Sequence, residues 1–271
     1  MKIIKIAFIL TIVVVLVHIV HALTFDRIIQ YREVSFYSSR WPENLDGYRI
    51  AFVVDTHDIS DGALEDVVRR INSLSVDMLL LGGDYSRTSY RQAIAILSRT
   101  ETSDGIFGVE GNHDVRSELS AAKEDYGIGF LFNSGLGVHE GFYLAGVEDF
   151  WWRNACIDTS IAGANDDDFV LLLSHNPDIT MAQDTSGVDM VVSGHSHGGQ
   201  ITFFGLWAPY LTLTDSFTEH GQRFMSGWSE AQDGTPVFVS NGTGGHRLIP
   251  RVFARPQVII FTMRHPSALP E

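Results

Sequence analysis

Residues 48–57 read YRIAFVVDTH, an apolar, strand-like run that stops at an aspartate and a histidine. Two further stretches have the same form, because residues 78–84 read MLLLGGD and residues 106–114 read IFGVEGNHD. Between them, apolar residues recur at helical spacing over 64–74 and 89–99. Strands that alternate with helices predict parallel pairing, and such sheets gather ligands at the carboxyl ends of their strands.

The second half of the chain contains more short apolar runs and fewer helical patterns. We expect strands over residues 142–147, 169–173, 188–192, 201–204, 237–239 and 258–262. Only one helix, at about 177–184, is predicted among them. The sequence therefore predicts an α/β fold, a four-layer αββα sandwich with two mixed sheets and with helices on the outside.

An apolar segment, residues 3–23, opens the chain behind Lys2. It just reaches the roughly 20 apolar residues that a helix needs to cross a bilayer, which favours a retained transmembrane anchor. A secretory signal that is cleaved near Ala22 is the alternative. We expect two parts, namely the anchor or signal segment over residues 1–23 and one domain over residues 24–271.

Charge bears on topology and on substrate. Lys2 and Lys5 precede the apolar segment and the charges after it are mixed, so the positive-inside rule places the domain outside the cytoplasm, with the cytoplasmic face as the alternative. The chain has 19 basic and 33 acidic side chains and a formal net charge of −14. An acidic surface repels polyanions, which disfavours nucleic acid as a partner but still admits a small phosphate ester.

Cys156 is the only cysteine, which excludes an internal disulfide.

Five motifs that contain histidine or aspartate stand where predicted strands end. They supply seven metal-ligating side chains: Asp55, His57, Asp84, Asn112, His175, His195 and His197. Asp84 follows Asp55 by about one βα unit, so its carboxylate is expected beside that of Asp55, where it can bridge two metal ions. His195 and His197 flank one serine in a glycine-bounded turn, a spacing with little structural use. Clustered histidine and aspartate residues of this kind indicate a metal site and metal-assisted hydrolysis of a phosphate ester.

The motif GNHD contains a ligand and two candidate catalytic residues. Asn112 offers an amide oxygen to a metal ion, and His113 beside it is expected to protonate the departing oxygen. Asp114 is expected to hold the tautomer of His113. Mixed nitrogen and oxygen ligands suit two divalent ions of Mn²⁺, Fe²⁺ or Zn²⁺ better than Mg²⁺.

As a set, these motifs resemble those of the calcineurin-like metallophosphoesterases, and more closely the membrane-associated bacterial branch of that superfamily. The resemblance covers roughly residues 47–263 and includes SHNPD at 174–178, GHSHGGQ at 194–200 and the late Arg255-Pro256. It implies a metal-dependent phosphoric ester hydrolase, a phosphodiesterase or phosphomonoesterase. It also implies one ion held by Asp55, His57 and His197, another held by Asn112, His175 and His195, and Asp84 shared by both.

One position departs from the family, because Asp58 stands where an apolar residue is usual. It is interpreted as a solvated or helix-capping acid, or as a contact to His57 or to a cationic part of the substrate. The aromatic runs at 151–152 and 203–207 are expected to pack in the fold or to line a site for an acyl or ring group. His246 is the further histidine that we expect nearest the site.

Three functions stay open on the sequence. The first is a membrane-tethered dinuclear phosphoesterase that acts on a small or lipid-linked phosphate ester. The second is a pyrophosphatase that cleaves UDP-2,3-diacylglucosamine in lipid A synthesis, which requires a cytoplasmic domain. The third is a non-catalytic scaffold, which would be expected to have lost ligands, whereas all seven are present here.

Overall fold

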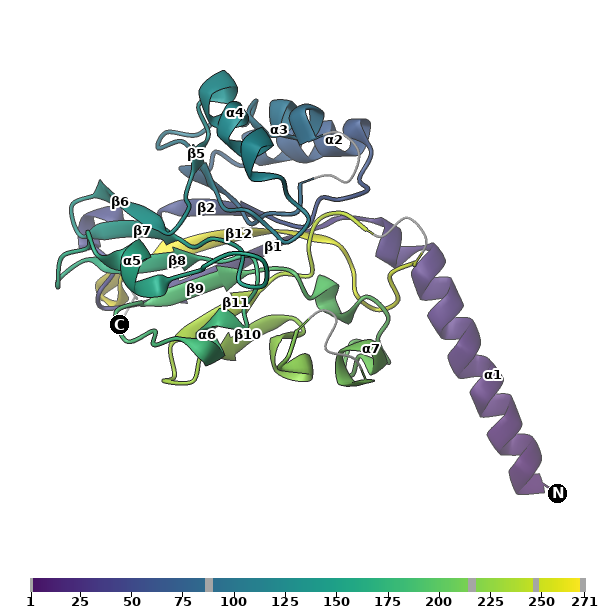
Figure 1. Cartoon of the computed structure of the whole chain (residues 1–271). Helices are drawn as coiled ribbons and strands as arrows, with labels where there is room; N and C mark the ends of the chain where they lie inside the picture. The colour runs from purple at the N-terminus through teal and green to yellow at the C-terminus, as the bar shows by residue number, and fades with distance from the viewer. Residues whose placement is uncertain (1, 86–89, 214–217, 246–248, 269–271) are drawn as a thin grey trace.

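The structure, a computed structural model, describes residues 2–85, 90–213, 218–245 and 249–268, and the statements below concern these residues. Two sheets of six strands each pack face to face (Figure 1). The first has the spatial order β1 (Gln30–Tyr37), β12 (Gln257–Arg264), β2 (Arg49–Val53), β3 (Met78–Leu81), β4 (Ile106–Gly108) and β5 (Gly129–Phe130). The second has the order β10 (Gly227–Glu230), β11 (Pro236–Val239), β9 (Met190–Ser193), β8 (Phe169–Leu173), β7 (Phe142–Gly146) and β6 (Ser134–His139).

Both sheets are mixed. In the first sheet only β12 and β2 pair antiparallel, while in the second the outer pairs β10–β11 and β6–β7 are antiparallel. The outer face of the first sheet is covered by α2 (Asp61–Asn72), α3 (Tyr90–Leu97) and α4 (Arg116–Tyr126). The second sheet has α5 (Ile157–Ile161) and α6 (Ile179–Ala182) on its outer side, and α7 (Pro209–Leu213) lies further along the chain. This arrangement confirms the predicted four-layer α/β sandwich.

Apolar packing between the sheets explains why the two layers stay together. Every residue of β3 and of β8 is buried, because both faces of these central strands are covered. The inner layer is rich in aromatic side chains, among them Phe52, Phe142, Phe169, Phe238 and Phe261. Each such side chain contributes roughly 1.5–3 kcal/mol when it is fully buried. A rigid double layer of this kind holds the loops at its edge in fixed positions.

The helix α2 shows how the sequence sets the first loop. Leu64, Val67, Val68 and Ile71 form its buried stripe. The Ser60 hydroxyl caps it by accepting a hydrogen bond from the backbone N–H of Ala63 at 3.3 Å. The cap is therefore Ser60 and not Asp58, which is half-buried in the loop between β2 and α2. The helix-capping interpretation of Asp58 was wrong for this reason.

Two predictions for the second half of the chain need correction. Residues 201–204 form no strand, since they make only isolated bridges from Ile201 to Val252 and from Phe203 to Trp207. The backbone turns at Phe204, whose φ is 55°, before a partner strand can be aligned. The helix predicted at about 177–184 covers only Ile179–Ala182, because Gln183 is extended, and α5 and α7 were not foreseen.

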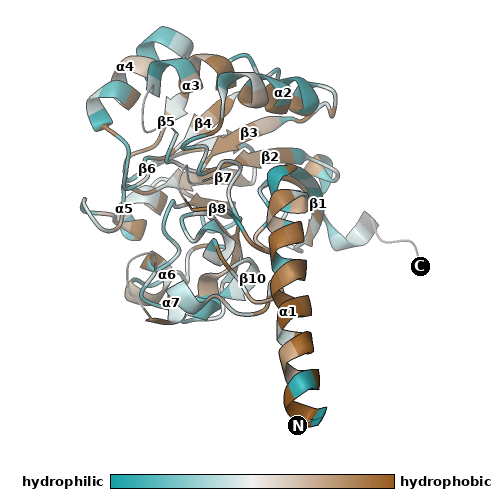
Figure 2. Cartoon of the chain, turned by 90° about the vertical axis from the view of Figure 1, so that its right-hand side faces the viewer, coloured by the Kyte–Doolittle hydropathy of each residue, from teal (hydrophilic) through white to brown (hydrophobic). Residues whose placement is uncertain are grey.

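The apolar segment at the start of the chain forms one long helix, α1 (Lys2–Leu23), which leaves the domain (Figure 2). None of its residues is buried, and its surface is apolar along most of its length. Together with the short 3₁₀ turn η1 (Phe25–Arg27), it is long and apolar enough to cross a membrane by length and composition. The other 3₁₀ turns are η2 (Glu43–Leu45), η3 (His197–Gly199), η4 (Gly221–Phe224) and η5 (Pro266–Ala268).

Candidate metal centre

The predicted ligand residues all follow strands at the same edge of the two sheets. In the first sheet, Asp55 and His57 follow β2, Asp84 follows β3, and Asn112 follows β4. Because these three strands are parallel neighbours, their carboxyl ends lie side by side. In the second sheet, His175 follows β8 and the His195–His197 turn follows its parallel neighbour β9. Stacking of the sheets brings the two groups of loops together.

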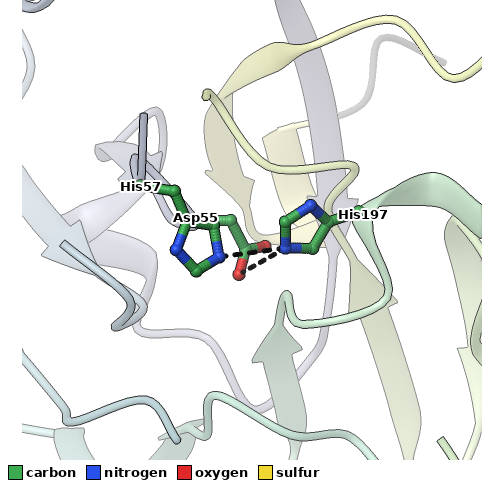
Figure 3. Close-up of side chains that lie close together, drawn as sticks. All are labelled: Asp55, His57 and His197. Carbon is green, nitrogen blue, oxygen red and sulfur yellow. Dashed lines mark hydrogen bonds and ion pairs between the residues drawn. The ribbon is translucent and has the colours of Figure 1, made fainter. Parts of the chain in front are cut away.

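Asp55, His57 and His197 form the first cluster (Figure 3). The Nε2 atoms of His57 and His197 lie 3.1 Å apart, and His197 Nε2 lies 3.7 Å from Oδ1 of Asp55. All three side chains are buried. Asp55 Oδ1 accepts no hydrogen bond from the part of the chain that the structure describes. A buried carboxylate oxygen without a donor, next to two imidazole nitrogens, suits a cation.

His175 is the centre of the second cluster. Its Nε2 atom lies 3.1 Å from Oδ1 of Asn112 and 3.1 Å from Nδ1 of His195. Its Nδ1 atom lies 2.8 Å from the carbonyl oxygen of Gly82, which directs Nε2 toward the other ligand atoms. His175 and His195 are buried, and Asn112 is half-buried at the rim.

Asp84 joins the two clusters. Its Oδ2 atom lies 3.2 Å from Nε2 of His57 and 3.5 Å from Nε2 of His175. With metal–ligand bonds of about 2.1 Å, neighbouring ligand atoms in tetrahedral or octahedral geometry lie about 3.0 to 3.4 Å apart. Most of the spacings in both clusters fall in or near this range, so the side chains present here fit divalent cations.

The matches to known proteins agree with this geometry. Residues 48–199, which include all the ligand residues named above, match the family model described as calcineurin-like phosphoesterase. The chain belongs to this family. Calcineurin-like phosphoesterases use divalent metal ions, which agrees with the chemistry of the clustered side chains.

Relatives of this phosphoesterase occur in bacteria and in animals. The uncharacterized metallophosphoesterase YkuE of Bacillus subtilis is 27% identical, and the match covers 87% of this chain and 86% of the relative. Phosphodiesterase YaeI of Escherichia coli is 24% identical over 82% of this chain and 84% of its own. The zebrafish (Danio rerio) transmembrane protein with metallophosphoesterase domain is 24% identical over 80% of this chain and 53% of its own.

The backbone of the phosphoesterase centre is strained. Five of the predicted ligand residues have positive φ angles, namely Asp55 (52°), His57 (28°), Asp84 (56°), His195 (68°) and His197 (52°). A residue with a side chain in such a conformation costs of order 1–3 kcal/mol, and this cost is typical of functional sites. In two of the loops both predicted ligand residues have such angles, Asp55 with His57 and His195 with His197.

Two glycines allow the first-sheet loops to approach each other. A methyl group at Gly83, whose φ is +95°, would lie 2.5 Å from the backbone nitrogen of Gly111. A methyl group at Gly111 would lie 2.3 Å from Oδ1 of Asp84. Both contacts are too short for carbon, so the motifs GGD and GNHD need glycine at these positions for packing.

Asp114 ties the same two loops together. Its carboxylate accepts hydrogen bonds from the backbone N–H groups of Asp84 (2.7 Å), Tyr85 (3.1 Å) and Gly111 (2.8 Å). Burial raises the pKa of Asp114 to about 7, with a further rise from the charge of Asp84, while these N–H groups lower it. Asp114 therefore shapes the loops, and its predicted contact with the imidazole of His113 stays a prediction.

His113 lies at the mouth of the site. Its side chain is exposed, and its ring centroid lies 5.5 Å from that of His57. Its backbone N–H donates to Oδ1 of Asp84 at 2.9 Å, which places it directly beside the joining carboxylate. An exposed imidazole at this place can reach a group that enters from solvent.

Charges within the cluster affect each other strongly. Burial opposes ionisation of Asp84, but the charges and hydrogen bonds of His175 and His57 outweigh it and hold the pKa of Asp84 well below its usual value. Burial lowers the pKa of His175, but the carboxylate of Asp84 outweighs this and raises it to about 10. Burial and the neighbouring His57 lower the pKa of His197 well below the ordinary value. The distance of 3.5 Å between Oδ2 of Asp84 and Nε2 of His175 agrees with this mutual stabilisation.

The sequence did not predict the role of Arg251. This side chain is buried and donates hydrogen bonds to the carbonyl oxygens of His197 (2.8 Å), Gly244 (2.6 Å) and Ala254 (3.0 Å). It thereby fixes the backbone of the turn that contains His197. Gly244 and Ala254 are near Arg251 in sequence, but His197 lies 54 residues earlier in the chain, and no sequence motif links the two.

The two tryptophans of the aromatic run at 151–152 have different surroundings. The ring of Trp151 meets that of His195 edge-on, with centroids 4.6 Å apart, whereas Trp152 is exposed. The buried Asp149 holds this loop, since its Oδ1 accepts a hydrogen bond from the backbone N–H of Trp152 at 2.7 Å. His246 lies outside the described residues.

Proposed function

We propose that this protein is a membrane-tethered, dinuclear phosphoesterase that hydrolyses a small or lipid-linked phosphate ester. The observation that carries the proposal is the position of Asp84, whose Oδ2 atom lies close to the Nε2 atoms of both His57 and His175. Two ions that share a ligand need one carboxylate that lies close to the other ligands of both ions, and Asp84 has this position. Membership of the phosphoesterase family supports the same chemistry.

The proposed ligand sets follow from the contacts. Asp55, His57 and His197 would hold one ion, and their ligand atoms lie within 4.8 Å of one another. Asn112, His175 and His195 would hold the other ion, and Asp84 would contact both. Each set mixes nitrogen and oxygen ligands, which favours Mn²⁺, Fe²⁺ or Zn²⁺ over Mg²⁺.

Divalent ions in this place supply positive charge for the phosphate oxygens and lower the pKa of a water molecule. The remaining roles belong to the chain itself. His113, exposed at the mouth, would donate a proton to the departing oxygen, a contribution of roughly 10²- to 10⁴-fold. Asp114 would hold the loop that presents His113 and Asn112, and Trp151 would limit access of water next to His195.

The tether in this proposal is α1. Its apolar, exposed surface and its length support a membrane anchor, and some relatives are named as transmembrane proteins. Lys2 and Lys5 would keep the amino end in the cytoplasm, so the domain would lie outside it. A reporter enzyme that works only outside the cytoplasm, fused to the carboxyl end, should be active. If instead a reporter that works only in the cytoplasm is active at this end, the domain lies in the cytoplasm and the proposed orientation is wrong.

Hydrolysis by the full chain in detergent tests the proposed activity. With Mn²⁺ present, we expect turnover of a generic aryl phosphodiester, with phosphomonoesters and lipid pyrophosphates measured beside it to define the preference. His57→Ala should reduce turnover to the background rate because it removes a ligand. His265→Ala, which alters a histidine that contacts Ser267 in the carboxyl-terminal region, is the matched control and should retain it. A wild-type chain that binds metal but hydrolyses none of these esters would indicate a scaffold.

A further inference from the structure

The segment 201–213 exposes an unusual amount of apolar surface. Its sequence, ITFFGLWAPYLTL, contains no charged residue, although the chain as a whole is strongly acidic. Leu206 is 80% exposed and Leu213 is 77% exposed. Further large exposed side chains of this segment are Ile201, Phe203, Phe204, Trp207 and Tyr210. A contiguous apolar surface of this kind on a soluble domain marks a contact with a membrane or a partner.

This segment lies against the last turns of α1. The ring of His18 packs against those of Phe203 and Phe204, with centroid distances of 5.4 Å and 4.6 Å. His18 also meets Phe253 at 4.9 Å, and His21 stacks on Phe253 at 3.8 Å. The aromatic side chains of 201–213 therefore lie level with the domain-proximal end of the helix that would cross the membrane. Aromatic residues concentrate at this level in membrane proteins, because their rings are favourable in the headgroup region.

Direct contacts connect this segment to the metal centre. It begins immediately after η3, the turn that contains His197. A methyl group at Gly199 in that turn would lie 2.4 Å from Cβ of Ala208, so the turn packs directly on the residue that precedes α7. Thr202 donates its backbone N–H to the carbonyl of Val252 at 2.9 Å, next to Arg251, which binds the carbonyl of His197. The segment and the metal turn are therefore one packed unit.

The centre and the anchor also lie on the same side of the domain. In Figure 1 the arrow of β12 points away from α1, and β2 runs antiparallel to β12. The carboxyl ends of β2, β3 and β4, which precede the ligand residues, therefore face the side on which α1 joins the domain. In the same view α7 lies on that side of the domain.

We infer that segment 201–213 is a second membrane-contact element, which inserts its aromatic and leucine side chains into the lipid headgroup region and holds the metal centre against the bilayer surface. The inference rests on the proposed membrane tether and deepens the proposed function. A bilayer is the occupant that the contacts favour, because the segment is uncharged and continues the apolar surface of α1.

The inference narrows the substrate class. A centre held at the bilayer surface can receive the phosphate of an amphipathic phosphoester while the apolar part of that molecule stays in the lipid. Such a substrate does not have to leave the bilayer, so the transfer free energy of its acyl chains, roughly 0.8 kcal/mol per CH₂, is not lost on binding. The exposed apolar side chains beside the centre would contact its upper acyl carbons.

Depth measurements on the full chain test the inference without any need for activity. In a Cys156→Ser background, single cysteines replace Leu206 or Leu213 and are labelled with an environment-sensitive fluorophore. These side chains are highly exposed, so the replacements should leave the fold intact. The protein is reconstituted into vesicles of phosphatidylcholine and phosphatidylglycerol. We expect lipid-borne nitroxides to quench both labels several-fold more strongly than they quench a label at Tyr126→Cys, at the end of α4 on the far side of the domain.

A label at Leu10→Cys in the middle of α1 separates two kinds of failure. If this label is quenched by lipid nitroxides and those at 206 and 213 are quenched by aqueous iodide like the control, the anchor stands and the inference is overturned. If the label in α1 is itself open to iodide, the tether in the proposed function fails too. Labels at 206 and 213 that are shielded from both quenchers would indicate a protein partner, which also overturns the inference.

Discussion

His113 differs from the other histidines of the centre in one respect, its exposure. The imidazoles of His57, His175, His195 and His197 are buried, whereas that of His113 faces solvent at the mouth. A buried imidazole among carboxylates suits a fixed ligand, while an exposed one can exchange protons with a substrate. The geometry therefore separates binding of ions from transfer of a proton.

This separation makes a prediction for His113→Ala. Turnover should fall by roughly 10²- to 10⁴-fold, because a general acid is removed, while the metal content per chain stays unchanged. Metal analysis and initial rates on the same preparation check both parts. His139→Ala, which removes a partly exposed histidine paired with Asp104, should change neither quantity. If the His113 variant loses metal, His113 contributes to metal binding, and the proposed role as proton donor is wrong.

Among the elements, the loops after β3 and β4 depend on each other for their shape. Gly83 lies against the backbone of Gly111, and Asp114 binds both loops through backbone N–H groups. Close contact between these loops places Asp84 beside Asn112 and His113. A side chain at the contact would push the loops apart and displace the joining carboxylate.

Gly83→Ala tests this dependence on loop packing. Overpacking costs typically 1–3 kcal/mol, to which the left-handed backbone adds about 1 kcal/mol. We expect a lower midpoint of thermal unfolding and weaker metal binding. Gly127→Ala is the matched control, since φ is +69° there but no atom lies within 4 Å of the added methyl group. Equal effects of the two variants on metal binding would contradict the packing argument.

The central strands could be predicted from the sequence because all of their residues are buried. The predicted bounds of β8 match the structure, and the apolar part of the run MLLLGGD forms β3, since strands covered on both faces appear as continuous apolar runs. The edge strand β1 was missed because only Val34 among its residues is buried. The helix α4 was missed because it buries only Leu119 and Ala122, which is too few for a periodic stripe.

The sequence also placed the predicted ligand residues in loops that the structure brings together. All seven predicted ligand side chains converge, because strand ends of parallel neighbours meet wherever the strands lie in the sheet. The contribution of Arg251 could not be predicted, since it depends on the carbonyl group of His197, which lies 54 residues earlier in the chain. The aromatic run at 203–207 was recognised, but its place beside α1 depends on how the helix leaves the domain.

On the scale of the whole molecule, cation binding should be coupled to protons. His175 has a pKa of about 10 because of Asp84, so its imidazole is protonated at neutral pH when no cation is bound. A metal ion can bind this imidazole only after the proton leaves, so affinity should fall as the pH falls below this pKa. We expect Mn²⁺ binding at neutral pH to release at least one proton per chain. Calorimetry in buffers with different ionisation enthalpies measures this release, and a binding heat independent of the buffer would refute it.

The metal content of wild type and Asp84→Asn tests the central claim most directly. Both proteins are purified as full chains in detergent, loaded with Mn²⁺, freed of excess ion and analysed by mass spectrometry. The shared carboxylate predicts two ions per wild-type chain and a loss of both from the Asp84 variant, while Asp66→Asn, an exposed acid on α2, retains two. A wild-type chain that holds fewer than two ions, or an Asp84 variant that keeps both, would contradict the account.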